Sequence, residues 1–311
     1  MAILVKDPGF ATTVQDLGRY GYSHLGISPA GAADSVSFRI ANLLVGNDEN
    51  APALEMTLTG ATLQFEEPAT IAVTGAECSV EINARRADCA QSIQLNAGSL
   101  VKIGHLALGA RAYFAVQGGI DVPLVMGSAS THLSARFGGF EGRLLRRGDR
   151  LQVRQSSGLH SRVAKAGALP LVNLRTHTTL HVTPGSQQDW FDADAFATLF
   201  SSPFTVSDQS GRTGLRLKGS TIDPRNRAQL LTDGVPLGAI QIPPDGHPII
   251  LFVDQQTTGG YPRIANVIAA DLHLVGQLRA RDTVRFAEVS IRQAIDALRQ
   301  QEIWLKELFA D

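Results

Sequence analysis

The stretch GRYGYSHLG (residues 18–26) returns in outline as GRTGLRLKG (residues 211–219), and both copies read G-R-x-G-x-x-x-x-G. Two further signatures follow each copy in the same order. They are P-x-G-A at 29–32 and 236–239, and L-R-x-x-D-x-apolar-x-apolar at 145–153 and 278–286. Three signatures in one order indicate a tandem duplication. We therefore expect both frames to mark the same turn in two copies of one architectural unit.

Short apolar stretches separated by turn residues dominate the chain and predict strands. They are ATIAVTG (69–75), SLVKIG (99–104), RAYFAVQGG (111–119), TLHVTPG (179–185), HPIILFVDQ (247–255) and DTVRFAE (282–288). Strands this brief and this frequent favour barrels or sandwiches over a doubly wound sheet. The predicted fold class is therefore mainly β, with a few helices at the periphery.

The duplication and the linker set the predicted domains. The small, polar stretch 155–170 is the natural linker. We expect a first β-barrel domain at 1–155 and a second at 171–311 that ends in a helix. From the start of the G-R-x-G frame to the start of the L-R-x-x-D signature there are 127 residues in the first copy and 67 in the second. We therefore place an insertion near 51–110 in the first domain.

Three helices are expected. Asp34 is the predicted N-cap of a helix over 34–47 that stops at Gly46, because Ile40, Leu43 and Leu44 share one face. Ser186 is the predicted N-cap of a second helix, with Asp189 three residues later. The tail from about Ala287 has apolar residues at helical spacing.

Composition excludes several classes of function. The net charge is −1, which gives no electrostatic reason to expect nucleic acid or an acidic membrane surface as a partner. No signal peptide and no apolar run long enough to span a membrane is recognised, so we expect a cytoplasmic protein. Cys78 and Cys89 are the only cysteines, too few for a disulfide scaffold or a four-thiolate metal site, and we expect reduced thiols.

Common catalytic signatures are missing from the sequence. There is no phosphate-binding loop, because LKGST (217–221) has Lys before Gly, and there is no G-x-S-x-G or H-E-x-x-H motif. His177 and His181 lie four residues apart in a strand-like segment, and we expect a structural pair there and no metal. If the chain takes part in ATP-dependent chemistry, we expect the nucleotide site elsewhere.

Two polar clusters in the first half are candidate sites. Gln15, Asp16 and Arg19 precede or follow Gly18, and Gly permits close backbone approach to a small polar ligand. A tight turn braced by an Asp–Arg pair is the alternative. Asp121 and the hydroxyls of Ser128, Ser130 and Thr131 follow a Gly-Gly pair and form a rim suited to a carboxylate or an amide. A glycine turn with capping hydroxyls is the alternative there.

A third polar cluster lies in the second half. Gln241 precedes a Pro-Pro-Asp-Gly hairpin turn. Further along, Asp254, Gln255, Gln256, Thr257 and Thr258 end an apolar strand and lead into Gly259, Gly260 and Tyr261. A solvated loop needs no such density of amide and hydroxyl groups, so we interpret this segment as part of a site.

The longest polar and glycine-rich segments resemble one family. They are TTVQDLGRYGYSHLGISPAGAAD, RIANLLVGNDENAPALE, RAYFAVQGGIDVPLVMGSAST, FGGFEGRLLRRGDRL, GVPLGAIQIPPDG and DQQTTGGYPRIA. The chain resembles, from about residue 8 to 286, the biotin-dependent carboxyltransferase family typified by allophanate hydrolase subunit 2, and within it the branch formed by the C subunits of 5-oxoprolinase. The second frame departs from the family stretch D-R-M-G-Y-R-L at Gly211, Thr213 and Leu215.

The resemblance implies a fold, partners and a reaction. The fold is two tandem cyclophilin-like β-barrels, and the partners are the A and B subunits of 5-oxoprolinase. The complex opens 5-oxo-L-proline to L-glutamate at the expense of ATP, because phosphorylation of the lactam oxygen makes the ring carbon a better electrophile. Donors in the pocket then stabilise the developing charge.

Two other functions of relatives remain open. One is carboxyl transfer to urea or another amide with biotin supplied in trans, and the other is a non-catalytic regulator that antagonises a kinase inhibitor. Whether the chain serves a 5-oxoprolinase or a carboxyltransferase, Arg19 and its second-copy counterpart Arg212 are expected to orient a carboxylate. The expected amide-binding or lactam-binding residues are Gln15, Asp121, Gln241, Gln255, Thr257, Thr258 and Tyr261. Asp16 is the candidate general base.

Overall fold

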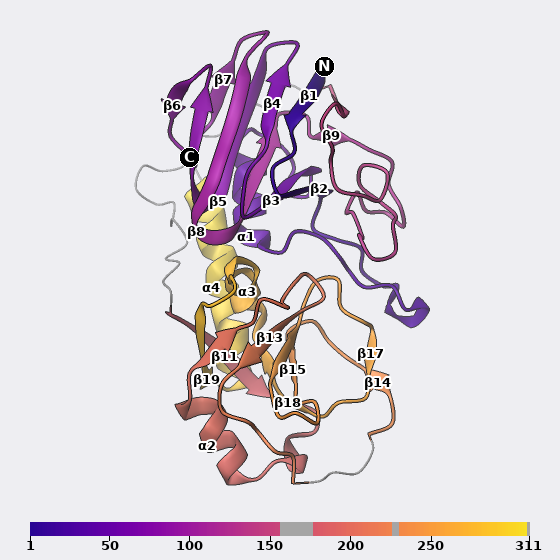
Figure 1. The fold of residues 1–311 in the computed structure, drawn as a ribbon, viewed down its shortest axis with the longest axis vertical. Coiled ribbons are helices and arrows are strands. Elements are labelled where there is room, and N and C mark those ends of the chain that lie inside the picture. The colour runs from indigo at the N-terminus through magenta and orange to yellow at the C-terminus, as the bar shows by residue number, and fades with distance from the viewer. Residues whose placement is uncertain (156–176, 226–229, 310–311) are drawn as a thin grey trace. The chain divides into compact units, whose positions relative to one another are not determined.

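A computed structural model describes residues 1–155, 177–225 and 230–309 (Figure 1). Contacts divide the chain into two units. Unit 1 takes Met1–Arg19, Ala30–Asn173 and Trp304–Asp311, and unit 2 takes Tyr20–Pro29 and Leu174–Ile303. The predicted linker, apart from Gln155, lies outside the described residues, and the boundaries 1–155 and 171–311 stay a prediction.

Unit 1 is built on a ten-stranded antiparallel sheet in the order β2-β3-β8-β4-β1-β10-β9, with β5 pairing β6, β7 and β8. Its strands are β1 (Ala2–Asp7), β2 (Ala11–Gln15), β3 (Ala53–Thr57), β4 (Thr62–Phe65), β5 (Ala69–Ile82), β6 (Arg85–Ala87), β7 (Ile93–Leu95), β8 (Leu100–Val116), β9 (Ile120–Asp121) and β10 (Arg150–Val153). Alternating buried and exposed side chains along β4 and β10 show that one face of each strand packs on the core.

The two longest strands of unit 1, β5 and β8, run side by side (Figure 1). The sequence predicts separate strands at 99–104 and 111–119, and this is wrong, because both belong to β8. Gly109 between them adopts a φ of +87°, and Gly75 on β5 adopts +93°. The register of the pair shifts beside Gly75. Gly109, which separates the two predicted strands, therefore belongs to a bulged region of one long strand.

Helix α1 (Ser35–Leu44) covers one face of the unit 1 sheet, and it begins as the sequence predicts. The Asp34 carboxylate accepts a hydrogen bond from the Ser37 N–H at 2.9 Å, which satisfies one of the free donors of the first turn. Ile40 and Leu44 lie in a core cluster with Ala72 and Tyr113 of the long strands. Gly46, with a φ of +74°, follows the helix end.

Unit 2 is a closed barrel in the order β11-β18-β15-β16-β13-β12-β19 with a separate two-stranded ribbon, β14-β17. Its strands are β11 (His177–Pro184), β12 (Phe204–Val206), β13 (Gly214–Lys218), β14 (Asp233–Gly234), β15 (Ala239–Gln241), β16 (Ile249–Leu251), β17 (Thr258–Gly259), β18 (Arg263–Val267) and β19 (Thr283–Glu288). The predicted Pro-Pro-Asp-Gly turn joins β15 to β16. The fold is thus mainly β with two barrel-like units, as the sequence predicts.

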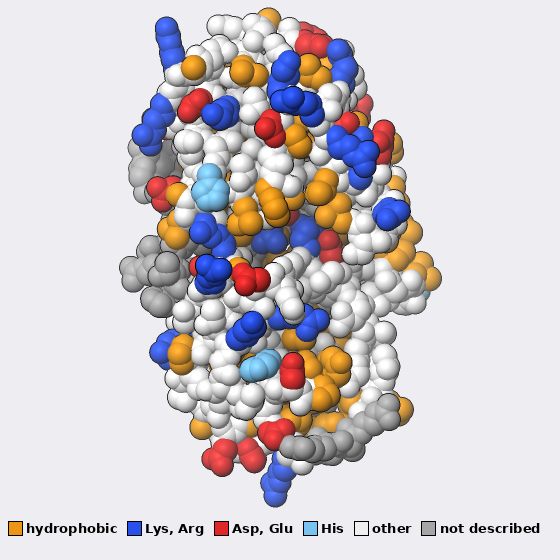
Figure 2. Space-filling model, viewed as in Figure 1, with side chains coloured by type: hydrophobic (Ala, Val, Ile, Leu, Met, Phe, Trp, Pro, Cys, Tyr) orange, Lys and Arg blue, Asp and Glu red, His pale blue; other side chains and the backbone are white. Residues whose placement is uncertain are grey.

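Helices occupy few of the described residues outside α1. They are α2 (Ala193–Ser201), α3 (Leu272–Gln277), α4 (Ile291–Leu308) and the short 3-10 turns η1 (Ser23–Leu25), η2 (Gln188–Trp190) and η3 (Ala269–Asp271). No helix among the described residues has the length and apolar character needed to cross a bilayer. Figure 2 shows basic and acidic side chains interspersed over the visible face, in keeping with the net charge of −1.

Two predicted helix starts are wrong. Asp192, not Ser186, caps α2 by accepting from the Ala195 N–H at 3.0 Å, because the preceding residues form the 3-10 turn η2. Helix α4 begins at Ile291 and not near Ala287, because β19 continues through Glu288. Ser290 and Gln293 then form a reciprocal capping box, with Ser290 N–H to Gln293 Oε1 at 2.8 Å and Gln293 N–H to Ser290 Oγ at 3.2 Å.

Two of the three repeated signatures adopt similar local structures in both halves of the chain. In L-R-x-x-D the Asp149 carboxylate accepts from the Arg146 N–H at 2.7 Å, and Asp282 accepts from Arg279 N–H at 2.8 Å, each just before a strand. In P-x-G-A both glycines have positive φ, +87° at Gly31 and +82° at Gly238.

The G-R-x-G frame does not recur as one turn, so that expectation is wrong. Gly18 and Gly21 have φ of +98° and +92°, whereas Gly211 and Gly214 are not in the left-handed region. Gly214 instead begins strand β13. The shared letters therefore cover two different backbone conformations.

Candidate functional site

The Asp16 carboxylate lies just after β2 and is enclosed by hydrogen-bond donors. Its Oδ1 accepts from the Gly18 N–H at 2.8 Å, from the Ser128 hydroxyl at 2.6 Å and from the Ser130 hydroxyl. Its Oδ2 accepts from the Ala129 N–H at 2.6 Å. The serine rim that the sequence predicts to hold a ligand's carboxylate or amide therefore holds a carboxylate of the protein itself.

These contacts bear on the expected role of Asp16. Three of the four donors bond Oδ1 and one bonds Oδ2, and the residue is only 2% exposed. The geometry gives Asp16 a positioning role, since it holds the segment 128–130 against the end of β2. Its role as a general base stays a prediction.

Arg19 and Gln15 complete the first cluster. The guanidinium of Arg19 donates to the carbonyls of Ser130 and of Val125 (Nε to O 3.4 Å) and lies 4.8 Å over the Phe137 ring. The Gln15 Nε2 donates to Thr13 Oγ1 at 3.0 Å and to the carbonyl of Thr131 at 3.3 Å. The Oε1 of Gln15, fully buried, accepts no hydrogen bond from any described residue.

Two glycines make this close packing possible. A Cβ on Gly31 would lie 2.8 Å from the Gly18 N, and one on Gly138 would lie 2.1 Å from the Ser130 carbonyl oxygen. Both have positive φ, +87° and +70°. A side chain at Gly31 would displace the backbone of the Asp16 turn, and one at Gly138 would displace the backbone at Ser130.

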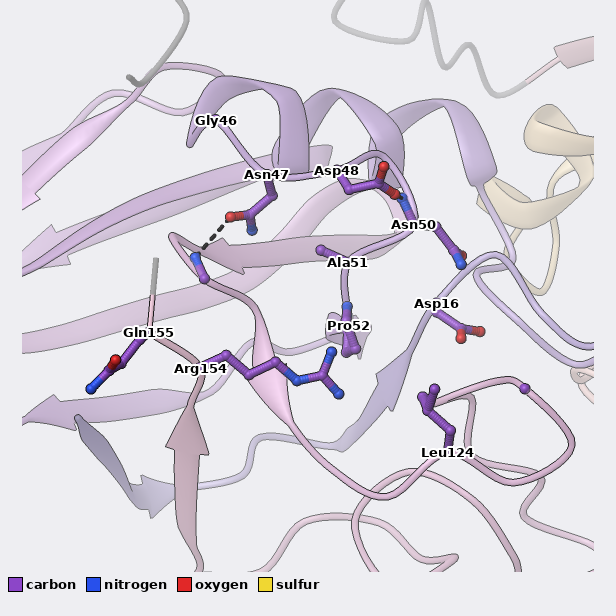
Figure 3. Close-up of a pocket in the computed structure, with 12 residues that line it drawn as sticks. Asp16, Gly46, Asn47, Asp48, Asn50, Ala51, Pro52, Leu124, Arg154 and Gln155 are labelled. Atoms are coloured by element: carbon purple, nitrogen blue, oxygen red, sulfur yellow. Dashed lines mark hydrogen bonds between the residues drawn. The ribbon is translucent and has the colours of Figure 1, made fainter. Parts of the chain in front are cut away.

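A cavity of about 350 Å³ opens beside Asp16 in unit 1 (Figure 3). Its lining contains several side-chain amides, two carboxylates and one guanidinium. The lining residues are Asp16, Gly46, Asn47, Asp48, Asn50, Ala51, Pro52, Gly118, Leu124, Gly127, Arg154 and Gln155. Polar groups of this density in a concave site suit a small polar ligand.

Arg154 is the one basic side chain among the lining residues. Figure 3 shows it extending from the end of β10 toward the middle of the lining residues, below Pro52. Its Nε donates to Asp121 Oδ1 at 3.1 Å, and Nη2 donates to the Val122 carbonyl at 3.3 Å. Predicted site residue Asp121 is thus placed as the partner that orients Arg154. The guanidinium remains 41% exposed and reachable by an anion.

The cavity wall is itself held by amides. Asn47 Oδ1 accepts from the Gly118 N–H at 2.8 Å, drawn as a dashed line in Figure 3. Asn50 Oδ1 accepts from the Leu17 N–H at 2.8 Å. These bonds tie the segment after α1 to the Gly-Gly turn and to the Asp16 turn.

In unit 2, the predicted third cluster gathers around the ribbon β14-β17. Gln241 Nε2 donates to the Tyr261 carbonyl at 3.4 Å, and Gln255 Nε2 donates to the Val235 carbonyl at 3.1 Å. Thr257 accepts from the Val235 N–H at 3.0 Å through its carbonyl. The Oε1 of Gln255, like that of Gln15, is buried and accepts no bond from a described residue.

Two members of the third cluster are accessible. Thr258 lies in β17 opposite Gly234, and its side chain is exposed. Tyr261 is 44% exposed. Gly259 between them passes so close to Gln241 that a Cβ there would lie 2.6 Å from its Nε2. The ribbon thus presents a hydroxyl and a phenol above a buried amide.

Arg212, also in unit 2, makes a two-pronged ion pair. Its Nε and Nη2 lie 2.8 Å and 3.0 Å from the two carboxylate oxygens of Asp254. Asp254 is 6% exposed. The carboxylate that Arg212 is predicted to orient is therefore, in this structure, that of Asp254.

Arg263 is a polar residue that the sequence reasoning missed. It is 3% exposed and donates to Asp233 Oδ2 at 2.7 Å, to Gln187 Oε1 at 2.8 Å and to the Gly234 carbonyl. The hydrogen bond from Arg263 holds the pKa of Asp233 below its ordinary 3.8. Arg154, Asn47 and Asn50 were missed as well, because each stands alone beside a strand or helix end with no spacing pattern.

Of the two histidines His177 and His181, the structure describes the side chain of His181. His181 Nδ1 lies 2.9 Å from Asp271 Oδ2, so this ring is held by a carboxylate. The described residues contain no group of three metal-ligating side chains.

The sequence profile described as "Carboxyltransferase domain, subdomain A and B" matches residues 25–288, most of the chain. The chain belongs to this carboxyltransferase domain family. It is 40% identical over 300 residues to the C subunit of 5-oxoprolinase from Escherichia coli (strain K12), and the match covers 96% of this chain and 95% of that protein. It is 38% identical to the C subunit of 5-oxoprolinase from Haemophilus influenzae, with 98% and 96% covered.

Among solved structures, the Kluyveromyces lactis urea amidolyase carries the same carboxyltransferase-type fold. The match has a TM-score of 0.94 at 33% identity and covers 99% of this chain. The chain spans 20% of that longer protein. The proteins that resemble this chain are thus named for different substrates, 5-oxoproline in some and urea in others.

Proposed function

We propose that this chain is the C subunit of an ATP-dependent 5-oxoprolinase and acts with the A and B subunits to open 5-oxo-L-proline to L-glutamate. The observation that carries the proposal is the two-way coverage of the 5-oxoprolinase relatives. This chain spans 95% and 96% of those proteins but only 20% of the urea amidolyase. Proteins of one length and one family are the simplest candidates for one role.

The chemistry of the proposed substrate fits the cavity beside Asp16. 5-Oxoproline carries one carboxylate and one lactam amide, so its recognition needs a cation together with amide donors and acceptors. Arg154 supplies the cation, and Asn47 and Asn50 lie along the same wall. ATP supplies the driving force by activating the lactam oxygen, and no residue of this chain is assigned to it.

The remaining predicted residues receive supporting roles in this proposal. Asp16 and Arg19 hold the loop 125–130 that contributes to the cavity, so they act as positioning residues. In unit 2, the exposed Thr258 and Tyr261 and the buried Gln255 would contact the amide of a substrate or a partner protein.

Carboxyl transfer with biotin supplied in trans is the second candidate. The family description and the TM-score of 0.94 to urea amidolyase favour it. It predicts an activity that needs a biotinylated protein and bicarbonate, which 5-oxoprolinase activity does not need. A non-catalytic regulator of a kinase inhibitor is the third candidate, and no observation on this structure favours it.

Reconstitution of the complex of all three proteins tests the proposal. The full chain is purified with the A and B subunits, and glutamate release from 5-oxoproline is followed with ATP, with ATP omitted and with avidin added. We expect ATP-dependent glutamate that avidin does not inhibit and that is lost when this chain is left out. A well-formed complex that releases no glutamate overturns the proposal, and inhibition by avidin transfers support to carboxyl transfer.

The role of Arg154 is tested by Arg154→Gln in the same complex. Loss of one cation–carboxylate contact is expected to raise the KM for 5-oxoproline about tenfold, which is about 1.4 kcal/mol of binding. Arg150→Gln is the matched control, since Arg150 begins the strand β10 that Arg154 follows, is 57% exposed and pairs with Glu66. An unchanged KM in Arg154→Gln would place the substrate carboxylate elsewhere.

A further inference from the structure

The two cysteines of the chain face each other at the end of the β5–β6 hairpin in unit 1. The antiparallel ladder ends where Val80 pairs with Ala87, and the two cysteines lie just beyond this pair, Cys78 on β5 and Cys89 in the bend after β6. The two Sγ atoms lie 3.9 Å apart, and Cys89 Sγ is 3.4 Å from the Cys78 carbonyl oxygen. Neither cysteine takes part in a disulfide.

The backbone suits a covalent link between them. A disulfide joins residues whose Cα atoms lie about 4.4–6.8 Å apart, and side chains whose Sγ atoms are already 3.9 Å apart come from neighbouring stretches of backbone. The residue after Cys89 is held in place, because the Ala90 N–H donates to the Val73 carbonyl at 2.7 Å. Formation of the bond needs the two Sγ atoms to close this remaining gap.

The pair is open to small molecules. Both side chains are half-buried, and both line a second cavity of about 170 Å³ together with Glu77, Arg86 and Asp88. A cavity of this volume has room for the end of a small thiol or disulfide, but it is too small for the surface of a second protein. The charged neighbours at its rim are of both signs.

The two thiols are not equivalent. The hydrogen bond shared with Cys78 lowers the pKa of Cys89, and the nearby Arg86 acts in the same direction, against burial and Asp88. The same hydrogen bond and burial raise the pKa of Cys78, and Glu77 adds to this. Cys89 is therefore the thiol of the pair that ionises more readily, and the thiolate is the nucleophilic form.

We propose that Cys78 and Cys89 form a redox-active dithiol, a modification site for low-molecular-weight disulfides. The Cys89 thiolate attacks one sulfur of a disulfide RSSR, which forms a Cys89–S–S–R bond and releases one RS⁻. Cys78, after losing its proton to solvent, attacks Cys89 Sγ and displaces the second RS⁻. In total, two protein thiols and one RSSR give one protein disulfide and two RSH.

Oxidised glutathione is the probe that tests this site. The full chain is incubated with it under native conditions, quenched in acid, and analysed by intact mass and by counting thiols after denaturation. We expect the two thiols of the reduced chain to disappear with no glutathione retained, with the chain still monomeric under non-reducing denaturing conditions, and to return after dithiothreitol. A retained glutathione, a disulfide-linked dimer or no reaction each overturns the proposal.

Single substitutions separate the two roles. Cys78→Ser removes the second attacking thiol, so Cys89 is expected to keep one glutathione. Cys89→Ser is expected to react at least tenfold more slowly, because burial and the nearby Glu77 still raise the pKa of the remaining Cys78 thiol. Circular-dichroism melting checks that both variants fold, and Cys78→Ala replaces Cys78→Ser if the serine hydroxyl unfolds the hairpin. Equal reactivity of the two single variants contradicts the assignment.

Discussion

Asp16 is predicted to be catalytic from its sequence context, but in the structure its carboxylate holds two segments of the chain together. Its four donors come from the turn after β2 and from residues 128–130, more than a hundred positions away along the chain. A buried carboxylate of this kind stabilises the structure only while its donors stay in place, because hydrogen bonds to charged groups contribute about 1.5–3 kcal/mol each.

Asp16→Ala is expected to lower the free energy of unfolding by about 3–5 kcal/mol, since it leaves buried hydroxyl and N–H donors without their acceptor. Urea denaturation of the purified chain measures the loss. Asp121→Ala is the control, because Asp121 is 56% exposed in its pair with Arg154. Exposed pairs contribute about 1 kcal/mol or less. An Asp16→Ala chain of wild-type stability that supports no activity would instead favour the general-base role.

The L-R-x-x-D turn is the element that the two halves share most closely, yet its two aspartates are in different environments. Burial alone would raise the pKa of Asp149, but hydrogen bonds from Arg143 and from the Arg146 N–H outweigh it and hold that pKa below 3.8. For Asp282, burial outweighs the bond from the Arg279 N–H and raises the pKa above 3.8. One turn therefore has opposite pH responses in its two copies.

The pH dependence of stability is expected to differ in sign between Asp149→Asn and Asp282→Asn. The stability that ionised Asp149 contributes is present above the unfolded-state pKa of about 3.9 and is lost as pH falls through the lower folded pKa. For Asp282 the contribution is present below about pH 3.9 and is lost as pH rises through the raised folded pKa.

Urea denaturation between about pH 3 and 6, the range around these pKa values, measures both variants against the wild type. The stability advantage of the wild type over Asp149→Asn should grow with pH. Its advantage over Asp282→Asn should shrink over the same range. Parallel curves for the two variants would show that the turn environments are alike.

At the scale of the whole molecule, the chain returns at its end to complete the core of unit 1. Leu305 and Leu308 of α4 are 1% and 2% exposed and belong to the same core cluster as Phe38 and Tyr113. Earlier apolar residues on the same helix are exposed, with Ile291 at 69% and Leu298 at 37%. The helical spacing in the sequence thus marks a helix without saying which of its apolar residues are buried.

Leu305→Ala is expected to lower the free energy of unfolding by about 2–5 kcal/mol, the usual cost of a large-to-small change in a core. Leu298→Ala, on the same helix, should cost about 1 kcal/mol or less because its side chain already meets solvent. Thermal and urea unfolding of the full chain compare the two. Equal losses would mean that the end of α4 does not pack on the unit 1 core.

Much of the local structure was predictable because its causes lie within a few residues. Asp34 caps α1 because a short acidic side chain reaches the N–H three residues on, and the Pro-Pro-Asp-Gly turn joins two strands because its residues favour that backbone. The sequence does not single out Asp192 as the cap because Ser186 offers the same signal six residues earlier, whereas in the structure the residues between them form the 3-10 turn η2.

The sequence by itself determined a mainly β chain with two barrel-like units, because strand length and turn residues are properties of short segments. The tertiary structure decided what the polar residues do. It brought Ser128 and Ser130 to Asp16, Asp254 to Arg212, Asp121 to Arg154 and Cys78 to Cys89. Hydrogen bonds and ion pairs act over a few ångströms of space, and distance along the chain does not predict that separation for residues on different strands.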